Sequence, residues 1–128
     1  MAMLWSVVSV MLLGIPAMIL HECGHIAMAV LCRVKIKKVG LSRRGVYTVR
    51  EPGPKWANLL VSLAGPLFNL FLAYASWDSM RTFAEINVVA CIYNLLPIPH
   101  SDGTRILALL SNTNAAVPQA MPEMQPRA

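Results

Sequence analysis

Residues 3–32 read MLWSVVSVMLLGIPAMILHECGHIAMAVLC, an apolar run in which the histidine and acidic side chains are confined to the cluster 21–25. The run is longer than the ~20 residues that a helix needs to cross a bilayer core. Charged side chains inside such a helix cost about 2.5–3.5 kcal/mol each on insertion. Their presence here indicates a functional site inside a membrane helix.

The cluster His21-Glu22-Cys23-Gly24-His25 has the form H-E-x-x-H. Residues four apart share one face of a helix, so both imidazoles can reach one metal ion, with Glu22 beside it. A catalytic zinc activates water at neutral pH, and a neighbouring carboxylate then exchanges the proton. The pattern predicts His21 and His25 as zinc ligands and Glu22 as general base. The alternative is a chance match in which both histidines are hydrogen-bonded core residues.

A catalytic zinc normally has a third protein ligand and an open position. The candidates are Asp102 and His100, which follow a proline-rich break, and Glu85, which lies at the other side of the membrane. Irregular backbone at membrane depth is tolerated only where it is buried in protein or lines a cavity, and a metal site is such a setting for Asp102. The other role for Asp102 is as the N-cap of a helix that begins near Thr104.

The composition also indicates a membrane protein. Of the 128 residues 56% are hydrophobic and 13% charged, and the mean hydropathy is +0.55. Residues 56–77 form a second uncharged run with tryptophan at both ends, as is common at membrane interfaces. A third run, 83–110, is broken at Pro97 and Pro99, which end a helix. We therefore predict a mainly α, polytopic membrane protein with three transmembrane helices, the third broken by prolines.

Eight of the 11 lysine and arginine residues lie in the loop 33–55 between the first two spans: Arg33, Lys35, Lys37, Lys38, Arg43, Arg44, Arg50 and Lys55. The positive-inside rule places this loop in the cytoplasm, which puts the N-terminus outside and the C-terminus inside. This setting favours lipid over nucleic acid as the partner of the basic loop. Within the loop, residues 34–50 resemble a short β-hairpin that turns at 42–45.

The predicted domain organisation is one core, residues 1–110, followed by a disordered tail, 111–128, which is polar and proline-bearing. Depth within the membrane follows from the helix rise. His21 precedes Cys32 by 11 residues, which is about 16 Å at 1.5 Å per residue. The candidate site is therefore expected inside the bilayer.

Three motifs in the chain resemble those of the site-2 proteases, which are intramembrane zinc metalloproteases. The cluster at 21–25 resembles the family's H-E-x-G-H, Gly65-Pro66-Leu67-Phe68-Asn69 its G-P-x-x-N, and residues 94–103, NLLPIPHSDG, its N-x-x-P-x-P-x-x-D-G. The motifs occur in the family's order, one per predicted span. Where the family usually has proline and leucine before Asp-Gly, this chain has His100 and Ser101, and Thr104 replaces a common glycine.

The resemblance implies a role for six residues. It implies one zinc ion held by His21, His25 and Asp102, with Glu22 as general base. It further implies that Asn94 steadies the oxyanion of the reaction and that Asn69 helps to shape the substrate channel.

The function that follows is hydrolysis of peptide bonds in or beside transmembrane segments of other membrane proteins. The expected partners are a membrane-protein substrate, the lipid bilayer, and a second copy or another membrane protein that covers the flanks of the core. The basic hairpin either pairs with an extended substrate or anchors to anionic lipid. The alternative function is a noncatalytic pseudoprotease or metal-binding membrane scaffold. A soluble zinc hydrolase fits poorly with three apolar runs.

Overall fold

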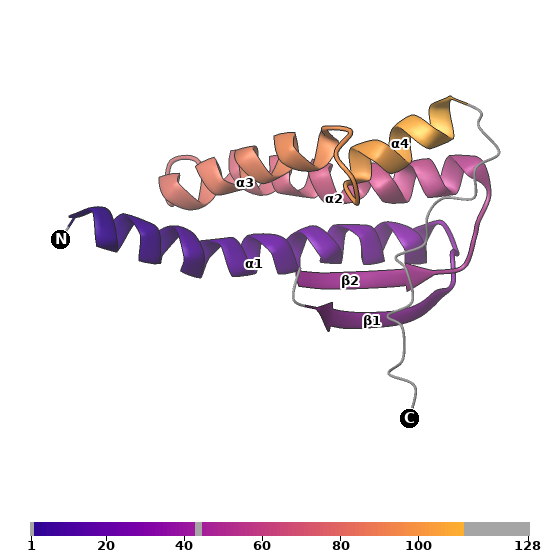
Figure 1. Cartoon of the computed structure of the whole chain (residues 1–128), viewed down its shortest axis with the longest axis horizontal. Helices are drawn as coiled ribbons and strands as arrows, with labels where there is room; N and C mark the ends of the chain where they lie inside the picture. The colour runs from indigo at the N-terminus through magenta and orange to yellow at the C-terminus, as the bar shows by residue number, and fades with distance from the viewer. Residues whose placement is uncertain (1, 43–44, 112–128) are drawn as a thin grey trace.

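The computed structural model describes residues 2–42 and 45–111, and the elements named here belong to those ranges. The helices lie side by side, and the hairpin lies along the C-terminal half of the first helix (Figure 1). In chain order the elements are α1 (Ala2–Leu31), β1 (Ile36–Ser42), β2 (Gly45–Arg50), α2 (Lys55–Ser76), α3 (Arg81–Leu95) and α4 (Asp102–Leu110).

Two of these helices, α1 and α2, have the length and composition of membrane spans. They agree with the predicted runs 3–32 and 56–77. Helix α3 has 15 residues, which corresponds to about 22 Å, short of the ~30 Å hydrocarbon core. The mainly α character is confirmed, whereas a third membrane crossing is not confirmed and stays a prediction.

The break predicted in the third apolar run is present. Helix α3 ends at Leu95, and its C-cap Leu96 is extended, with φ −67° and ψ 142°. Pro97 and Pro99 cannot donate the backbone hydrogen bonds that would continue the helix. The chain then turns through His100, whose φ of 72° lies in the left-handed region, and begins α4 at Asp102.

The predicted hairpin is also confirmed. Strands β1 and β2 pair antiparallel from Ile36↔Arg50 to Ser42↔Gly45, with an irregularity between Ile36 and Lys38. The two turn residues, 43 and 44, lie outside the described residues. Ile36 packs against a small core cluster formed by Ala29, Val34, Ala57 and Val61, so the base of the hairpin is attached to both α1 and α2.

Small residues let α1 and α2 approach closely. A Cβ added at Gly24 would lie 2.9 Å from both the Ala64 carbonyl oxygen and the Phe68 Cβ. Such close contact through small side chains is a common way for membrane helices to associate. It brings the histidine face of α1 against α2. The division into a core at 1–110 and a tail at 111–128 stays a prediction, because all of that tail except Ser111 is outside the described residues.

Candidate metal centre

The two histidines of the H-E-x-x-H cluster lie together on the buried face of α1. Their side chains project from adjacent turns, and the two Nε2 atoms are 3.0 Å apart. His21 is 6% and His25 4% exposed. The spacing of four residues therefore brings both rings to one point between α1 and α2.

Asp102 reaches the same point from the first residue of α4. Its Oδ2 atom lies 3.1 Å from the Nε2 of His21 and 3.1 Å from the Nε2 of His25, and the residue is 6% exposed. The proline break thus turns the chain back so that a carboxylate distant in sequence meets the histidines. The N-cap of α4 is Ser101, so the alternative in which Asp102 caps this helix is wrong.

The Nδ1 atom of each histidine determines which nitrogen of that ring carries the lone pair. His25 Nδ1 lies 2.6 Å from the carbonyl oxygen of Val61, which can only accept, so Nδ1 donates. His21 Nδ1 lies 2.5 Å from Asn69 Oδ1 and donates to it. In the neutral rings, both Nε2 atoms then carry lone pairs that face each other and Asp102 Oδ2. Three such atoms gathered in a buried space are stabilised by a cation at their centre.

The spacing of these three atoms fits zinc. Donor atoms about 2.0–2.1 Å from a tetrahedral zinc lie about 3.3 Å from one another, close to the 3.0–3.1 Å observed among His21, His25 and Asp102. A second set, in which Glu22 replaces Asp102, has its ligand atoms within 4.8 Å of one another. We favour the set with Asp102, because its atoms are closer together and Glu22 is engaged elsewhere.

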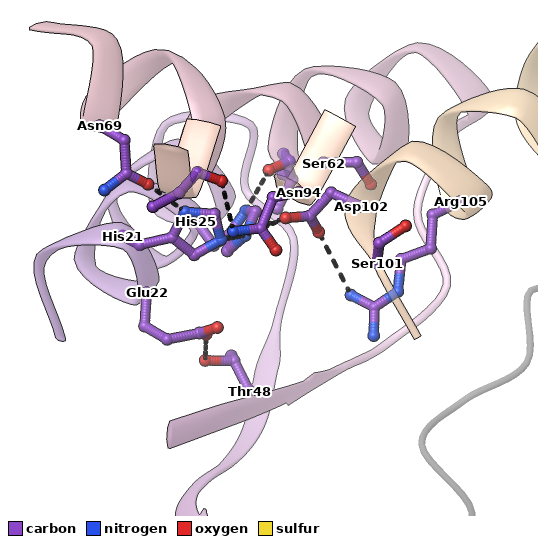
Figure 2. Close-up of polar contacts among 12 residues, drawn as sticks. His21, Glu22, His25, Thr48, Ser62, Asn69, Asn94, Ser101, Asp102 and Arg105 are labelled. Carbon is purple, nitrogen blue, oxygen red and sulfur yellow. Dashed lines mark hydrogen bonds and ion pairs between the residues drawn. The ribbon is translucent and has the colours of Figure 1, made fainter. Parts of the chain in front are cut away.

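Glu22 points from α1 towards strand β2 (Figure 2), where Thr48 Oγ1 donates a 3.0 Å hydrogen bond to its Oε2. This contact orients the carboxylate beside the candidate metal position. Thr48 and Arg50 are two residues apart and therefore share one face of β2. The hairpin is thus part of the site.

Two arginines lie near the acidic residues. Arg105 Nη1 is 3.9 Å from Asp102 Oδ1, the oxygen that does not face the histidines. Arg50 Nη2 donates to Ser62 Oγ at 3.2 Å. Burial lowers the pKa of Arg50, and the charge of Arg105 lowers it further, while Asp102 and Glu22 oppose the shift. Arg50 nevertheless stays protonated, so both guanidinium groups offset the negative charge of the site.

Two of the three residues in which this chain departs from the family pattern, Ser101 and Thr104, hold the loop before α4. Ser101 Oγ accepts from the backbone N–H groups of Thr104 at 3.3 Å and Ile98 at 3.2 Å, and donates to the Leu96 carbonyl at 2.5 Å. Thr104 Oγ1 donates to the Ile98 carbonyl at 2.7 Å. The two hydroxyl groups therefore satisfy the backbone that the prolines interrupt, and they fix the position of Asp102.

The other predicted residues take different places. Asn94 Nδ2 donates to the Ala90 carbonyl of its own helix at 2.9 Å. Glu85 is on the surface and pairs with Arg81 at 3.1 Å. His100 is exposed, and within the described residues it makes no hydrogen bond or ion pair to the cluster. Neither Glu85 nor His100 joins the three clustered ligand atoms.

Asn69, predicted to shape the substrate channel, is 0% exposed and bonds directly to His21. Its neighbour in the G-P-x-x-N motif, Gly65, packs against both histidine rings. Three residues of the site, Thr48, Asn87 and Arg105, are not among those predicted from the sequence. The only sequence signal for Thr48 is the alternation of β2, and Asn87 and Arg105 belong to no motif.

No protein-family model matches the chain. Among curated proteins, the chain is similar to stage IV sporulation protein FB of Bacillus subtilis (strain 168), with 34% identity over 105 residues, which cover 72% of this chain and 36% of the relative. It is also similar to the zinc metalloprotease MJ0392 of Methanocaldococcus jannaschii, with 29% identity over 121 residues, 84% of this chain and 35% of the relative.

A third relative is the putative zinc metalloprotease YwhC of Bacillus subtilis, with 32% identity over 76 residues, 42% of this chain and 35% of the relative. The chain thus spans about a third of the length of the curated relatives that it matches. These similarities agree with the three motifs and with the cluster that two of those motifs form. The predicted resemblance of the chain to the site-2 protease family is confirmed by these relatives.

Proposed function

We propose that this chain is the catalytic core of an intramembrane zinc metalloendopeptidase that cleaves transmembrane or membrane-proximal segments of other membrane proteins. The observation that supports this most strongly is the set of three ligand atoms within 3.1 Å of one another, contributed by His21, His25 and Asp102. This set lies on helices whose outward faces are apolar, with Glu22 beside it.

Zinc, when bound, polarises the scissile carbonyl and makes water nucleophilic at neutral pH. Glu22 takes a proton from the attacking water and later delivers it to the leaving amine. Thr48 donates to one carboxylate oxygen of Glu22, and the other oxygen is the one that we assign to this exchange. Arg105 faces the outer oxygen of Asp102 and favours its ionised form.

Asn94 is the proposed donor to the oxyanion. Its side chain first releases the Ala90 carbonyl, to which it donates in this structure, and turns towards the scissile carbonyl. A donor placed there contributes about 2.7–4 kcal/mol to catalysis. The substrate helix must unwind locally, because helical backbone hides the scissile carbonyl.

The proposed setting is a membrane with the N-terminus outside and with the basic loop and the C-terminus in the cytoplasm. Loop residues 33–55 are rich in lysine and arginine, as the positive-inside rule requires. A second copy of the chain or another membrane protein would cover the exposed apolar flanks.

A noncatalytic metal-binding scaffold is the second candidate. The observation that favours it is the bond between Asn94 and its own helix, which leaves the oxyanion donor turned to the backbone. Both candidates predict bound zinc, so metal content alone does not distinguish them.

The Glu22→Gln variant separates the two functions. The parent and the variant are purified in detergent, and each is incubated with a single-span reporter whose membrane segment contains glycine and proline to ease unwinding. A protease mechanism predicts that the variant keeps its zinc and loses cleavage by at least about 100-fold, since general base catalysis contributes about 10²–10⁴. Equal cleavage by both proteins would contradict the role of Glu22. Zinc binding without cleavage by the parent would favour the scaffold.

A further inference from the structure

Behind the candidate zinc site, a row of two hydrogen-bonded, buried carboxamide side chains leads away from His21. The first link is the hydrogen bond from His21 Nδ1 to Asn69 Oδ1 at 2.5 Å, between α1 and α2. The second is the hydrogen bond from Asn69 Nδ2 to Asn87 Oδ1 at 2.7 Å, between α2 and α3. Both asparagines are 0% exposed, so water does not compete for these bonds.

The hydrogen bond at the far end of this row of carboxamides determines which group donates and which accepts at each link. Asn87 Nδ2 lies 2.8 Å from the backbone carbonyl of Phe83, which can only accept. Asn87 therefore presents its oxygen to Asn69, which donates through its nitrogen and presents its own oxygen to His21. That oxygen accepts from Nδ1 of the ring, and the lone pair of the neutral ring is then on Nε2. One main-chain carbonyl thus determines which nitrogen of His21 faces the metal position.

The same groups hold the ring in place. Asn69 Nδ2 also lies 3.4 Å from the Ala17 carbonyl of α1, one turn before His21. The carboxamide of Asn69 therefore contacts α1 at two places, and Asn87 ties it to α3. Within the part of the chain that the structure describes, no buried side-chain nitrogen or oxygen is left without a hydrogen bond. Reversing the network would turn the Asn87 oxygen to the Phe83 carbonyl, which cannot donate.

We infer that Asn69 and Asn87 are positioning residues for zinc binding, acting through His21. They set its tautomer and the orientation of its ring, so that Nε2 is presented beside His25 Nε2 and Asp102 Oδ2. This inference rests on the proposed zinc site and assigns a function to Asn87, which lies outside the three motifs. It also gives Asn69 a role behind the metal in place of one in the substrate channel.

The zinc affinity of the purified protein tests this inference. It is measured in detergent by competition with a chromogenic chelator. Asn69→Leu and Asn87→Leu are similar in size to the parent residues but cannot form the hydrogen bonds. Loss of such an outer partner of a ligating histidine weakens metal binding about 10–100-fold, and we expect both variants to fall in that range. Asn58→Leu is the matched control, because this carboxamide of α2 donates to the Gly53 carbonyl at 2.7 Å, away from His21. It should bind zinc as the parent does.

Rescue separates positioning from general stability. Asn69→Asp keeps an oxygen that accepts from His21 Nδ1 and loses the donor to Asn87. We expect it to bind zinc nearly as tightly as the parent and much more tightly than Asn69→Leu. Equal loss in the aspartate and leucine variants, or parent-like affinity in both leucine variants, would overturn the inference.

A second measurement needs no variant and so does not depend on folding of the substituted proteins. In the zinc-loaded parent with isotope-labelled histidine, nuclear magnetic resonance should find His21 bound through Nε2 with a proton on Nδ1. Binding through Nδ1 would overturn the inference while leaving the zinc site intact. A parent chain that binds no zinc would instead refute the proposed function, and the inference with it.

Discussion

At the scale of single residues, the site depends on the absence of a side chain as much as on the ligands. Gly65 faces the two imidazoles across the α1–α2 contact. A Cβ built there would lie 2.6 Å from His25 Cε1 and 2.7 Å from His21 Cε1, distances that real Cβ atoms essentially never show. The glycine of the G-P-x-x-N motif therefore makes room for the two histidine rings, the candidate metal ligands.

Gly65→Ala is expected to displace both rings and to weaken zinc binding by more than about tenfold, the lower end of the effect of disturbing a ligating histidine. Chelator competition measures this loss. Gly14→Ala is the control, since a Cβ at Gly14 of α1 would meet nothing within 4 Å. If Gly65→Ala bound zinc as tightly as Gly14→Ala, the rings would not occupy the positions described.

Part of the site could be predicted from the sequence. His21, Glu22 and His25 follow from helical spacing, and Asp102 from its place after a break and from the family resemblance. Thr48 and Asn87 could not be predicted, because their contacts join elements that are distant in the sequence and carry no local pattern. The metal-ligand, base and substrate roles of the predicted residues stay predictions.

At the scale of elements, the irregular segment between α3 and α4 determines where Asp102 lies. Ser101 caps α4 and also receives the Ile98 N–H, while Thr104 ties the first turn of α4 back to Ile98. A Cβ added at Gly103 would collide with the Leu95 carbonyl. The start of α4 therefore packs tightly against the end of α3, and the carboxylate of Asp102 has little freedom.

Ser101→Ala removes the N-cap, and loss of a serine cap typically costs about 0.5–2 kcal/mol. We expect a lower midpoint of thermal unfolding and weaker zinc binding, because Asp102 is the next residue. Ser76→Ala is the comparison, since Ser76 Oγ donates to the Leu72 carbonyl of α2 at 2.7 Å and lies in the last residue of that helix. A Ser101→Ala variant with parent-like unfolding and zinc affinity would show that the hydroxyl network does not hold the ligand.

The elements themselves could largely be predicted. The length of the two apolar runs predicted α1 and α2. The β-branched residues on both sides of a turn predicted the hairpin, and Pro97 and Pro99 predicted the break. The length of α3 could not be predicted, because an apolar run does not distinguish a spanning helix from a shorter one that packs beside others.

At the scale of the whole molecule, the described residues expose a broad apolar surface. The first half of α1 is the clearest part, with Leu4 65%, Trp5 70%, Met11 68% and Leu12 63% exposed. Monomeric soluble proteins rarely expose apolar patches larger than a few hundred Å². We propose that lipid, a second copy or another membrane protein covers this surface.

Membrane extraction tests whether this apolar surface lies in a membrane. The expressed chain should remain in the membrane pellet after an alkaline carbonate wash and enter solution only with detergent, because two helices have the length and composition of spans. The Leu41→Cys variant, substituted at a residue of the basic hairpin that is 79% exposed, should react with a membrane-impermeant label only after the cytoplasmic face is opened. Recovery of the chain in the aqueous wash would contradict the membrane assignment.

Metal analysis of the purified chain and three variants tests the zinc site most directly. The parent is expected to hold one zinc ion, His25→Ala and Asp102→Ala to lose it, and His100→Ala to retain it, because Asp102 Oδ2 lies 3.1 Å from both histidine nitrogens while His100 is exposed outside the cluster. Full zinc in Asp102→Ala together with loss of zinc in His100→Ala would contradict the ligand set of His21, His25 and Asp102.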